Sequence, residues 1–281
     1  MKEMRPLFLI GNKRSGTSLL VRVLNLHPNI FISHESDVVW ILYQFHRQQP
    51  FVAHRWDSDR GMKHTVAAAG DLLQHSRRPE ENFRAVICKL MEQGTPWLKP
   101  MHKPDLRWIG DKKPFQHIDP DLVPFIRESF PDALFLHIVR HPCAVAASSE
   151  SFNETGFGDF WLDLTLEQKV DRWAENEELV RQMRDEMPER VHSLRYEDFC
   201  RHTSQELERI FRFLGVPADE NAMKEAAKGT LAGVRSYPKI KGSAETEQIA
   251  KRYGYDLGVG TSRWKARCEQ SYWKWAKKFF S

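Results

Sequence analysis

The sequence predicts an α/β fold, in which helices flank a central, mainly parallel β-sheet. Short, continuous apolar runs recur along the chain, as expected of strands that are buried on both faces. Segments with apolar residues at helical spacing separate these runs. Strands that alternate with helices in this way form parallel sheets. With 281 residues and no internal repeat, residues 1–281 are expected to form a single domain.

Four apolar runs are predicted as strands. The clearest covers residues 133–139 (ALFLHIV), a run typical of a central parallel strand. The others cover residues 6–10, 106–110 and 191–194.

Helices are predicted between these strands. The first begins at Thr17, after a turn over residues 11–16, and ends before His27 and Pro28. Proline is tolerated in the first turn of a helix, so Pro142 predicts another helix start. The remaining predicted helices cover residues 35–47, 81–93, a stretch after Asp119, 165–186, 203–214 and 268–280.

Two regions differ in composition from the rest. Residues 50–104 are rich in His, Arg and Trp and are predicted to hold two or three helices. Residues 239–262 are polar and glycine-rich, and predict a mobile loop. Long loops in compact domains are often functional.

Composition excludes several classes of protein. The chain has 42 Lys and Arg against 38 Asp and Glu, a net charge of +4, which predicts no nucleic-acid partner but suits an anionic ligand. Four scattered cysteines without a CxxC motif favour a reducing, cytoplasmic location and predict no metal site. No apolar run reaches the roughly 18 residues of a membrane helix. The first residues also lack the apolar core of a signal peptide.

The turn after the first strand predicts an anion site. Residues 11–18 (GNKRSGTS) have the spacing GxxxxGK[ST] between a strand and a helix. Glycines let backbone N–H groups point inward at a phosphate, and the helix start adds its positive end. The predicted binding residues are Lys13, Arg14, Ser15, Gly16, Thr17 and Ser18. The alternative is a plain glycine turn with solvated cations.

The loop lacks one residue of a kinase or NTPase loop. Thr17 stands where the lysine that reaches the β- and γ-phosphates belongs. Arg14 is the replacement cation, and its guanidinium can grip a phosphate or sulfonate with two hydrogen bonds.

Residues 10–20 (IGNKRSGTSLL) resemble the 5′-phosphosulfate loop of sulfotransferases that use 3′-phosphoadenosine 5′-phosphosulfate (PAPS). The RSGT form is similar to the tyrosylprotein and carbohydrate branches and their bacterial relatives. The resemblance implies a three-layer P-loop-type fold, and it covers residues 6–40, 110–152, 194–217 and weakly 262–264. Residues 50–104 lie outside it, and we interpret them as a helical insertion on the acceptor side.

Residues 139–148 (VRHPCAVAAS) resemble the 3′-phosphate element of the same family. Arg140 at a strand end and Ser148 on the following helix would converge on one phosphate beside the first loop. The alternative is that Arg140 is a surface cation that caps a helix.

The resemblance also implies a general base. Glu35 aligns with the glutamate that removes the acceptor proton in the tyrosylprotein branch. The alternatives are a helix-start glutamate favoured by the macrodipole, or His34 as the base. Neighbouring residues at a helix start point about 100° apart, so one of the two is expected to face the sulfonate.

Further residues follow from the resemblance. Lys112 is expected to stabilise the transferring group, with Lys113 as the alternative. Tyr196, in a segment similar to the family's RYEDL element, would approach the adenosine or belong to the core. Ser262 would contact the 5′-phosphosulfate, and Lys239, Lys241 and Lys265 would cover the 3′-phosphate or be solvated.

The resemblance implies a sulfotransferase that moves the sulfuryl group from PAPS to an acceptor hydroxyl, without a metal. Ser36 and Asp37 follow Glu35 where the tyrosylprotein branch has a basic residue. This difference favours a carbohydrate, lipid or metabolite over a protein tyrosine as acceptor. A homodimer is possible in either case. The alternatives are an ATP-dependent small-molecule kinase and a non-catalytic nucleotide-binding protein.

Overall fold

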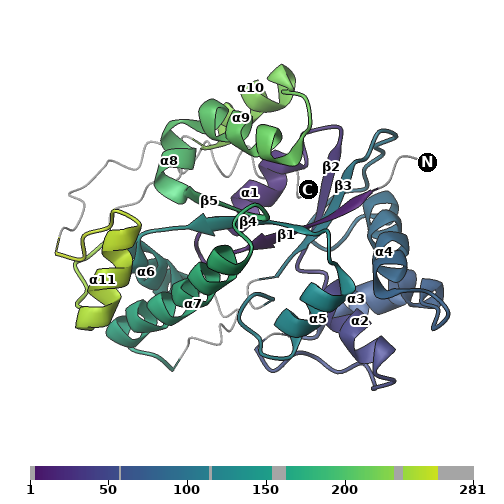
Figure 1. Cartoon of the computed structure of the whole chain (residues 1–281), viewed down its shortest axis with the longest axis horizontal. Helices are drawn as coiled ribbons and strands as arrows, with labels where there is room; N and C mark the ends of the chain where they lie inside the picture. The colour runs from purple at the N-terminus through teal and green to yellow at the C-terminus, as the bar shows by residue number, and fades with distance from the viewer. Residues whose placement is uncertain (1–3, 57, 114–115, 154–162, 231–236, 259–281) are drawn as a thin grey trace.

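The computed structural model describes residues 4–56, 58–113, 116–153, 163–230 and 237–258. Within these residues, five strands form one sheet in the order β2-β3-β1-β4-β5 (Figure 1). They are β1 (Arg5–Ile10), β2 (Ile30–His34), β3 (Trp108–Lys112), β4 (Leu134–Val139) and β5 (Val191–Arg195). Every pairing is parallel. The carboxyl ends of all five strands therefore meet at one edge of the sheet.

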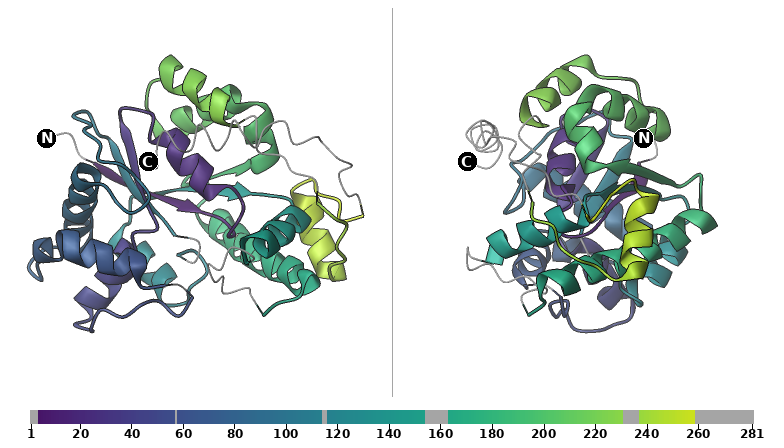
Figure 2. Two further views of the ribbon diagram at one scale, coloured as in Figure 1. Left: turned by 180° about the vertical axis from the view of Figure 1, so that it is seen from behind. Right: turned by 90° about the vertical axis from the view of Figure 1, so that its left-hand side faces the viewer.

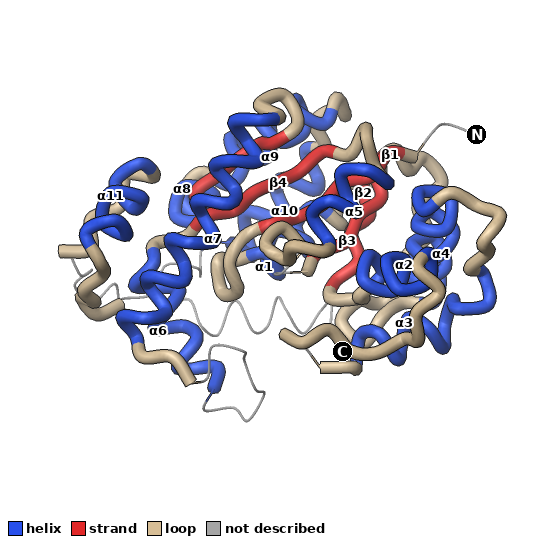
Figure 3. The backbone as a smooth tube through the Cα atoms, turned by 60° about the horizontal axis from the view of Figure 1, so that its bottom comes forward, coloured by secondary structure: helices blue, strands red, loops and turns tan. Residues whose placement is uncertain are grey.

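Helices cover both faces of the sheet and make three layers, as the sequence predicts. One face carries α1, α8, α9 and α10, and the other carries α2, α4, α5 and α7 (Figures 1 and 2). Figure 3 shows the strands, in red, side by side with helices along them. The helices are α1 (Thr17–Leu24), α2 (Val38–His46), α3 (Arg60–Ala69), the 3₁₀ turn η1 (Gly70–Leu72), α4 (Pro79–Gln93), α5 (Leu122–Ser129), α6 (Pro142–Asn153), α7 (Leu166–Glu186), α8 (Tyr196–Arg201), α9 (Thr203–Leu214), α10 (Glu220–Thr230) and α11 (Ala244–Arg252).

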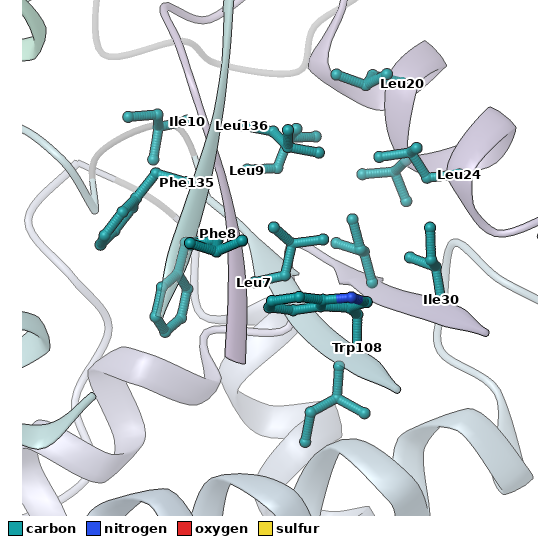
Figure 4. Packing of buried hydrophobic residues seen from close by; sticks show 14 of the residues in the cluster. Leu7, Phe8, Leu9, Ile10, Leu20, Leu24, Ile30, Trp108, Phe135 and Leu136 are labelled. Carbon is teal, nitrogen blue, oxygen red and sulfur yellow. The ribbon is translucent and has the colours of Figure 1, made fainter. Parts of the chain in front are cut away.

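The core lies between the sheet and its helices. Leu7, Phe8 and Leu9 of β1 have no exposed surface, because layers cover both faces of this central strand. Figure 4 shows these residues beside Phe135 of β4 and Trp108 of β3. The burial of both faces explains why this strand reads as a continuous apolar run.

The predicted helix over residues 35–47 is wrong at its start. Residues Ile30–His34 form the edge strand β2, which the sequence analysis missed, and α2 begins only at Val38. Glu35 and Asp37 between them have left-handed backbones, with φ of 51° and 57°. Glu35 therefore follows a strand and is not a helix-start residue. The macrodipole explanation for this glutamate does not apply.

The predicted loop over residues 239–262 is wrong for residues 244–252, which form α11. The Ser243 hydroxyl accepts a hydrogen bond from the Thr246 N–H and so caps the helix. Ile249 and Ala250 are buried in a cluster with α7. The polar composition of this segment reflects its exposed face.

Other predicted elements are confirmed within a few residues. Thr165 caps α7 with its hydroxyl, Pro142 begins α6, and Gly215 ends α9 in the left-handed conformation. Residues 50–104 contain α3, η1 and α4. The predicted helix over 268–280 lies outside the described residues. In the part of the chain that is described, no helix is long and apolar enough to span a membrane.

Candidate functional site

The carboxyl edge of the sheet gathers most of the residues that the sequence analysis selected. Parallel strands deliver their following residues to the same side, which is the usual ligand side of an open α/β sheet. The loop over residues 11–16 follows β1, Glu35 follows β2, and Tyr196 follows β5. Lys112 is the last residue of β3, and Arg140 follows β4.

The loop after β1 depends on close backbone contacts. A Cβ atom on Gly16 would lie 2.3 Å from Cδ2 of Tyr196, and one on Gly11 would lie 2.5 Å from the carbonyl oxygen of Ile138. Both glycines have positive φ angles, of 97° and 146°. The Ser15 hydroxyl is buried and has no hydrogen-bond partner within the described residues. The Ser15 hydroxyl and the N–H groups at the start of α1 are therefore available to bind an anion.

A buried network of polar side chains connects the loop to helix α7. The Asn12 amide donates to Glu177 Oε1 of α7 at 2.8 Å and accepts from Asn176 Nδ2 at 2.7 Å. Glu177 Oε2 lies 3.1 Å from Nε2 of His137, and neither side chain has exposed surface. This network fixes the loop backbone against α7.

The two predicted phosphate elements are in direct contact. Arg14 Nε donates to Ser148 Oγ at 3.2 Å, and Arg140 donates to the Arg14 carbonyl oxygen at 2.9 Å. The Arg140 guanidinium also lies 4.6 Å from the centre of the Tyr196 ring. Arg14 is exposed, whereas Arg140 is buried. The two predicted phosphate elements thus bring the Arg14 and Arg140 cations to the loop that leads into α1.

Tyr196 is the first residue of α8, and its side chain is 7% exposed. Its ring packs on Gly16 and beneath Arg140. Tyr196 is therefore a core residue, as one alternative predicts, and it contacts the loop and Arg140.

Glu35 and Lys112 form an ion pair at the ends of β2 and β3. Lys112 Nζ lies 2.5 Å from Glu35 Oε1, and the Glu35 N–H donates to the Lys112 carbonyl oxygen at 3.0 Å. The lysine side chain is 1% exposed and the glutamate side chain 33%. Burial acts to raise the pKa of the Glu35 carboxyl, but the surrounding positive charges, Lys112 foremost, and the hydrogen bond from Lys112 together outweigh burial and lower the pKa. Glu35 is thus an ionised carboxylate with one face open to solvent.

Lys113 has a different environment from Lys112. Its Nζ lies 2.7 Å from Asp37 Oδ1, and both side chains are buried, at 3% and 2% exposed. This second pair joins the same two strand ends away from solvent. The structure therefore turns Lys112 toward Glu35 and Lys113 toward Asp37.

His34 and Glu35 point to different partners, although not for the helical reason given from the sequence. His34 is the last residue of β2, and its Nε2 lies 2.8 Å from Ser18 Oγ. Burial lowers the pKa of His34 to about 3, and the charge of Lys112 adds to this effect. The imidazole is therefore neutral and committed to the start of α1.

Helix α3 packs against the other side of Glu35. A Cβ atom on Gly61 would lie 2.1 Å from the Glu35 carbonyl oxygen, so only glycine allows this approach. The Arg60 guanidinium lies 4.2 Å from the centre of the Trp97 ring, and this ring meets His34 edge-on. The segment after residue 50 therefore packs against the Glu35 backbone and the His34 ring.

Some predicted residues lie away from this cluster or outside the described residues. Lys13 is half-buried in the loop, and Lys239 and Lys241 are exposed. Ser262 and Lys265 lie outside the described residues. Among the residues that are described, no group of three or more His, Cys, Asp or Glu side chains is arranged to hold a metal ion.

Comparison with protein families identifies the relatives of this chain. The model of the sulfotransferase family matches residues 6–220, which is more than half of the sequence. The chain belongs to the sulfotransferase family. Comparison with curated proteins gave no match.

Solved structures share the fold of this sulfotransferase-family chain at low sequence identity. The sulfotransferase domain of the curacin biosynthetic pathway has a TM-score of 0.58 and 18% identity, over 92% of this chain and 100% of that domain. The sulfotransferase domain of the Synechococcus PCC 7002 olefin synthase has a TM-score of 0.53 and 19% identity, over 99% of this chain and 95% of that domain. Sulfotransferase STF9 from Mycobacterium avium has a TM-score of 0.52 and 12% identity, over 89% and 76%.

Sequence reasoning missed three residues that shape the site of this sulfotransferase-family chain. Asn12 and Glu177 meet across 165 positions, and only the folded chain reveals such a contact. Gly61 gave no signal, because a single glycine near a helix start is common. For Glu177, the one available sign was a charged residue on the inner side of a predicted amphipathic helix.

Proposed function

We propose that this chain is a PAPS-dependent sulfotransferase, with PAPS bound along the carboxyl edge of the sheet. The observation behind this proposal is the contact of two anion-binding elements. Arg14, in a phosphate loop without the kinase lysine, reaches Ser148, and Arg140 bonds to the Arg14 carbonyl oxygen. An ATP-dependent enzyme needs the lysine, whereas a nucleotide with a separate 3′-phosphate needs the second arginine.

The loop and the residues at the strand ends would bind different parts of the nucleotide. The 5′ side would be held by the loop N–H groups and by the side chains of Lys13, Arg14, Ser15, Thr17 and Ser18. The 3′-phosphate would be held by Arg140 and Ser148, with Tyr196 beside the adenosine and Ser262 as a further contact. No step of the proposal needs a metal ion, because these cations neutralise the phosphates.

The proposed transfer is an in-line displacement. Glu35 removes the proton from the acceptor hydroxyl while the acceptor oxygen forms a bond to sulfur. The bond from sulfur to the 5′-phosphate oxygen breaks, and its electron pair remains on the phosphate. Arg14, Lys112 and the loop N–H groups stabilise this charge, and preorganised donors of this kind supply most of the rate enhancement in related group transfers.

The ion pair between Glu35 and Lys112 links binding to chemistry. The Lys112 ammonium has three N–H donors, and it donates to Glu35 Oε1 with an N···O distance of 2.5 Å. While the lysine is held in this way, it lowers the basicity of the carboxylate. An anion bound in the loop would attract Lys112 and so make Glu35 a stronger base only when the sulfuryl donor is present.

We place the acceptor on the side of α3. The Glu35 side chain is one-third exposed, and Gly61 of α3 packs against the Glu35 carbonyl oxygen. The acceptor must carry a hydroxyl group within reach of Glu35. The acidic residue at position 37 is engaged by Lys113 and buried, so this position offers no cation for an acidic peptide.

Two nucleotides that differ only at the 3′ position test the proposal. Adenosine 3′,5′-bisphosphate (PAP) and adenosine 5′-monophosphate (AMP) should be compared by calorimetry with the unmodified chain and with Arg140→Met, which keeps the apolar stem of the side chain. Charge-assisted hydrogen bonds contribute about 1.5–3 kcal/mol, or roughly 10- to 150-fold in affinity. We expect PAP to bind tighter than AMP by this factor, and the variant to bind the two almost equally.

Other outcomes identify the alternatives. Binding of ATP with Mg²⁺ but not of PAP would refute the proposal in favour of a kinase. PAP binding without release of radiolabelled sulfate or sulfated product from ³⁵S-labelled PAPS, across a set of sugar, lipid and phenol acceptors, would favour a non-catalytic nucleotide-binding protein.

A further inference from the structure

His34 has no role in the proposed transfer, yet it lies between the base and the phosphate loop. Its Nε2 lies 2.8 Å from Ser18 Oγ, and its side chain is 8% exposed. Ser18 is the second residue of α1, in the helix turn that faces the loop. The Trp97 ring packs edge-on against the imidazole with centroids 6.3 Å apart.

The position of the imidazole proton follows from burial and contacts. A neutral imidazole carries one N–H, on either Nδ1 or Nε2. Nδ1 is buried and has no hydrogen-bond partner among the described residues. A buried N–H without an acceptor is costly, so the proton belongs on Nε2, where Ser18 Oγ accepts it.

This tautomer determines what Ser18 can do. The hydroxyl group has one proton and can accept two hydrogen bonds. When it accepts from His34, its own O–H remains available and is turned away from the imidazole. In the opposite arrangement, Ser18 would donate to His34 and would present only lone pairs to an anion in the loop, which would repel it.

We propose that His34 is a positioning residue that makes Ser18 a hydrogen-bond donor to the anion held by the loop over residues 11–16. The inference rests on the proposed function, since it needs an anionic nucleotide in this loop. It also explains why His34 is not the base: its one polar proton is directed at Ser18 and not at the acceptor.

A double-mutant cycle tests the inference. Ser18→Ala removes the donor, His34→Leu removes the group that orients it, and His34→Gln retains an N–H at a similar reach. We expect Ser18→Ala and His34→Leu each to weaken PAP binding about tenfold, as for loss of one hydrogen bond to a charged group. The double variant should bind as weakly as either single variant, and His34→Gln should stay within about threefold of the unmodified chain.

Two controls separate positioning from stability. His64→Leu changes another partly buried histidine, which contacts the Gly94 carbonyl oxygen outside the site, and it should leave PAP binding unchanged. Thermal unfolding of each variant shows whether the protein measured is folded. The pH profile of sulfuryl transfer in His34→Gln should match that of the unmodified chain, because a positioning residue does not exchange its proton.

Three results would overturn the inference. Additive losses in the double variant would show that His34 does not act through Ser18. A loss in His34→Gln as large as in His34→Leu, with an altered pH profile, would point to His34 as the base. Absence of PAP binding to the unmodified chain would instead refute the proposed function, and the inference with it.

Discussion

Replacement of Glu35 by Gln gives the sharpest test of the proposed base. Glutamine keeps the shape of the side chain and an oxygen that accepts from Lys112, but it loses the charge and the ability to take a proton. General-base catalysis contributes roughly 10²- to 10⁴-fold to a rate. We expect the single-turnover rate at saturating PAPS to fall by this factor. PAP affinity should be unchanged or higher, because Lys112 is freed from a competing carboxylate.

The ion-pair geometry also sets the expected change in stability. A hydrogen bond to a charged group contributes about 1.5–3 kcal/mol. The Glu35 side chain is 33% exposed, so solvent screening reduces this to about 1 kcal/mol. For a chain of this size, the melting temperature should fall by roughly 2–4 °C.

Asp37→Asn is the matched control, because it breaks the neighbouring pair with Lys113. Both partners are buried, and loss of one partner of a buried pair costs about 3–5 kcal/mol. We expect a large loss of stability from this variant, measured by urea unfolding, with a smaller effect on the transfer rate of the folded fraction. The two variants should therefore separate catalysis from folding.

A Glu35→Gln variant within about tenfold of the unmodified rate would refute this reasoning. The pH dependence of kcat/KM for PAPS reports the ionisations of the free enzyme. A decrease of kcat/KM on the acid side, with a midpoint near pH 6 to 7, would also refute the reasoning. The pKa of Glu35 is lowered from 4.5, so the base stays ionised, and the profile should be flat on the acid side down to about pH 5.

Three further predictions concern the framework around the site. Gly16→Ala should abolish PAP binding, since its Cβ would lie 2.3 Å from the Tyr196 ring. Gly215 also has a positive φ, but no atom lies near its Cβ position, so Gly215→Ala should lower the free energy of unfolding by about 1 kcal/mol and leave PAP binding intact. Lys103→Met should lower the free energy of unfolding by about 3 kcal/mol, because the Lys103 ammonium donates hydrogen bonds to three backbone carbonyl oxygens after α1. A change below about 1 kcal/mol, measured by urea unfolding, would contradict this prediction. Burial acts to raise the pKa of Asp119, but the hydrogen bonds to its carboxylate together outweigh burial and lower the pKa below 3.8. The ionised carboxylate therefore stabilises the fold above about pH 4, and this stabilisation is lost as the pH falls further. Asp119→Asn should thus be less stable at pH 7 yet lose less stability between pH 4 and 2, as measured by thermal unfolding.

The sequence predicts the central part of the fold and much of the site. The runs that became β1 and β4 are apolar throughout because both faces are buried, and this pattern is visible without a structure. The loop over residues 11–16 and Arg140 follow these two strands directly, so local order predicts that they share one edge. Glu35, in contrast, was selected only through resemblance to the sulfotransferase family.

Other features depend on contacts that sequence patterns do not encode. The turn between β2 and α2 uses Glu35 and Asp37 at positive φ, and neither residue signals such a turn as glycine would. The predicted helix therefore begins at residue 35 instead of Val38, and the strand over residues 30–34 is not predicted. The contact between His34 and Ser18 depends on how β2 pairs with β3 and on where α1 packs.

The strand order has a consequence for how the chain acquires its structure during synthesis. β1 and β2 are the first two strands made, but β3 lies between them in the sheet. Neither strand has a hydrogen-bonding neighbour until Trp108 and the residues after it leave the ribosome. At roughly 5–20 residues per second, this delay lasts on the order of several seconds. During it, a nascent segment with two unpaired apolar strands must be shielded from aggregation. The proposed anion site, which draws on all five strand ends, cannot form until β5 is complete.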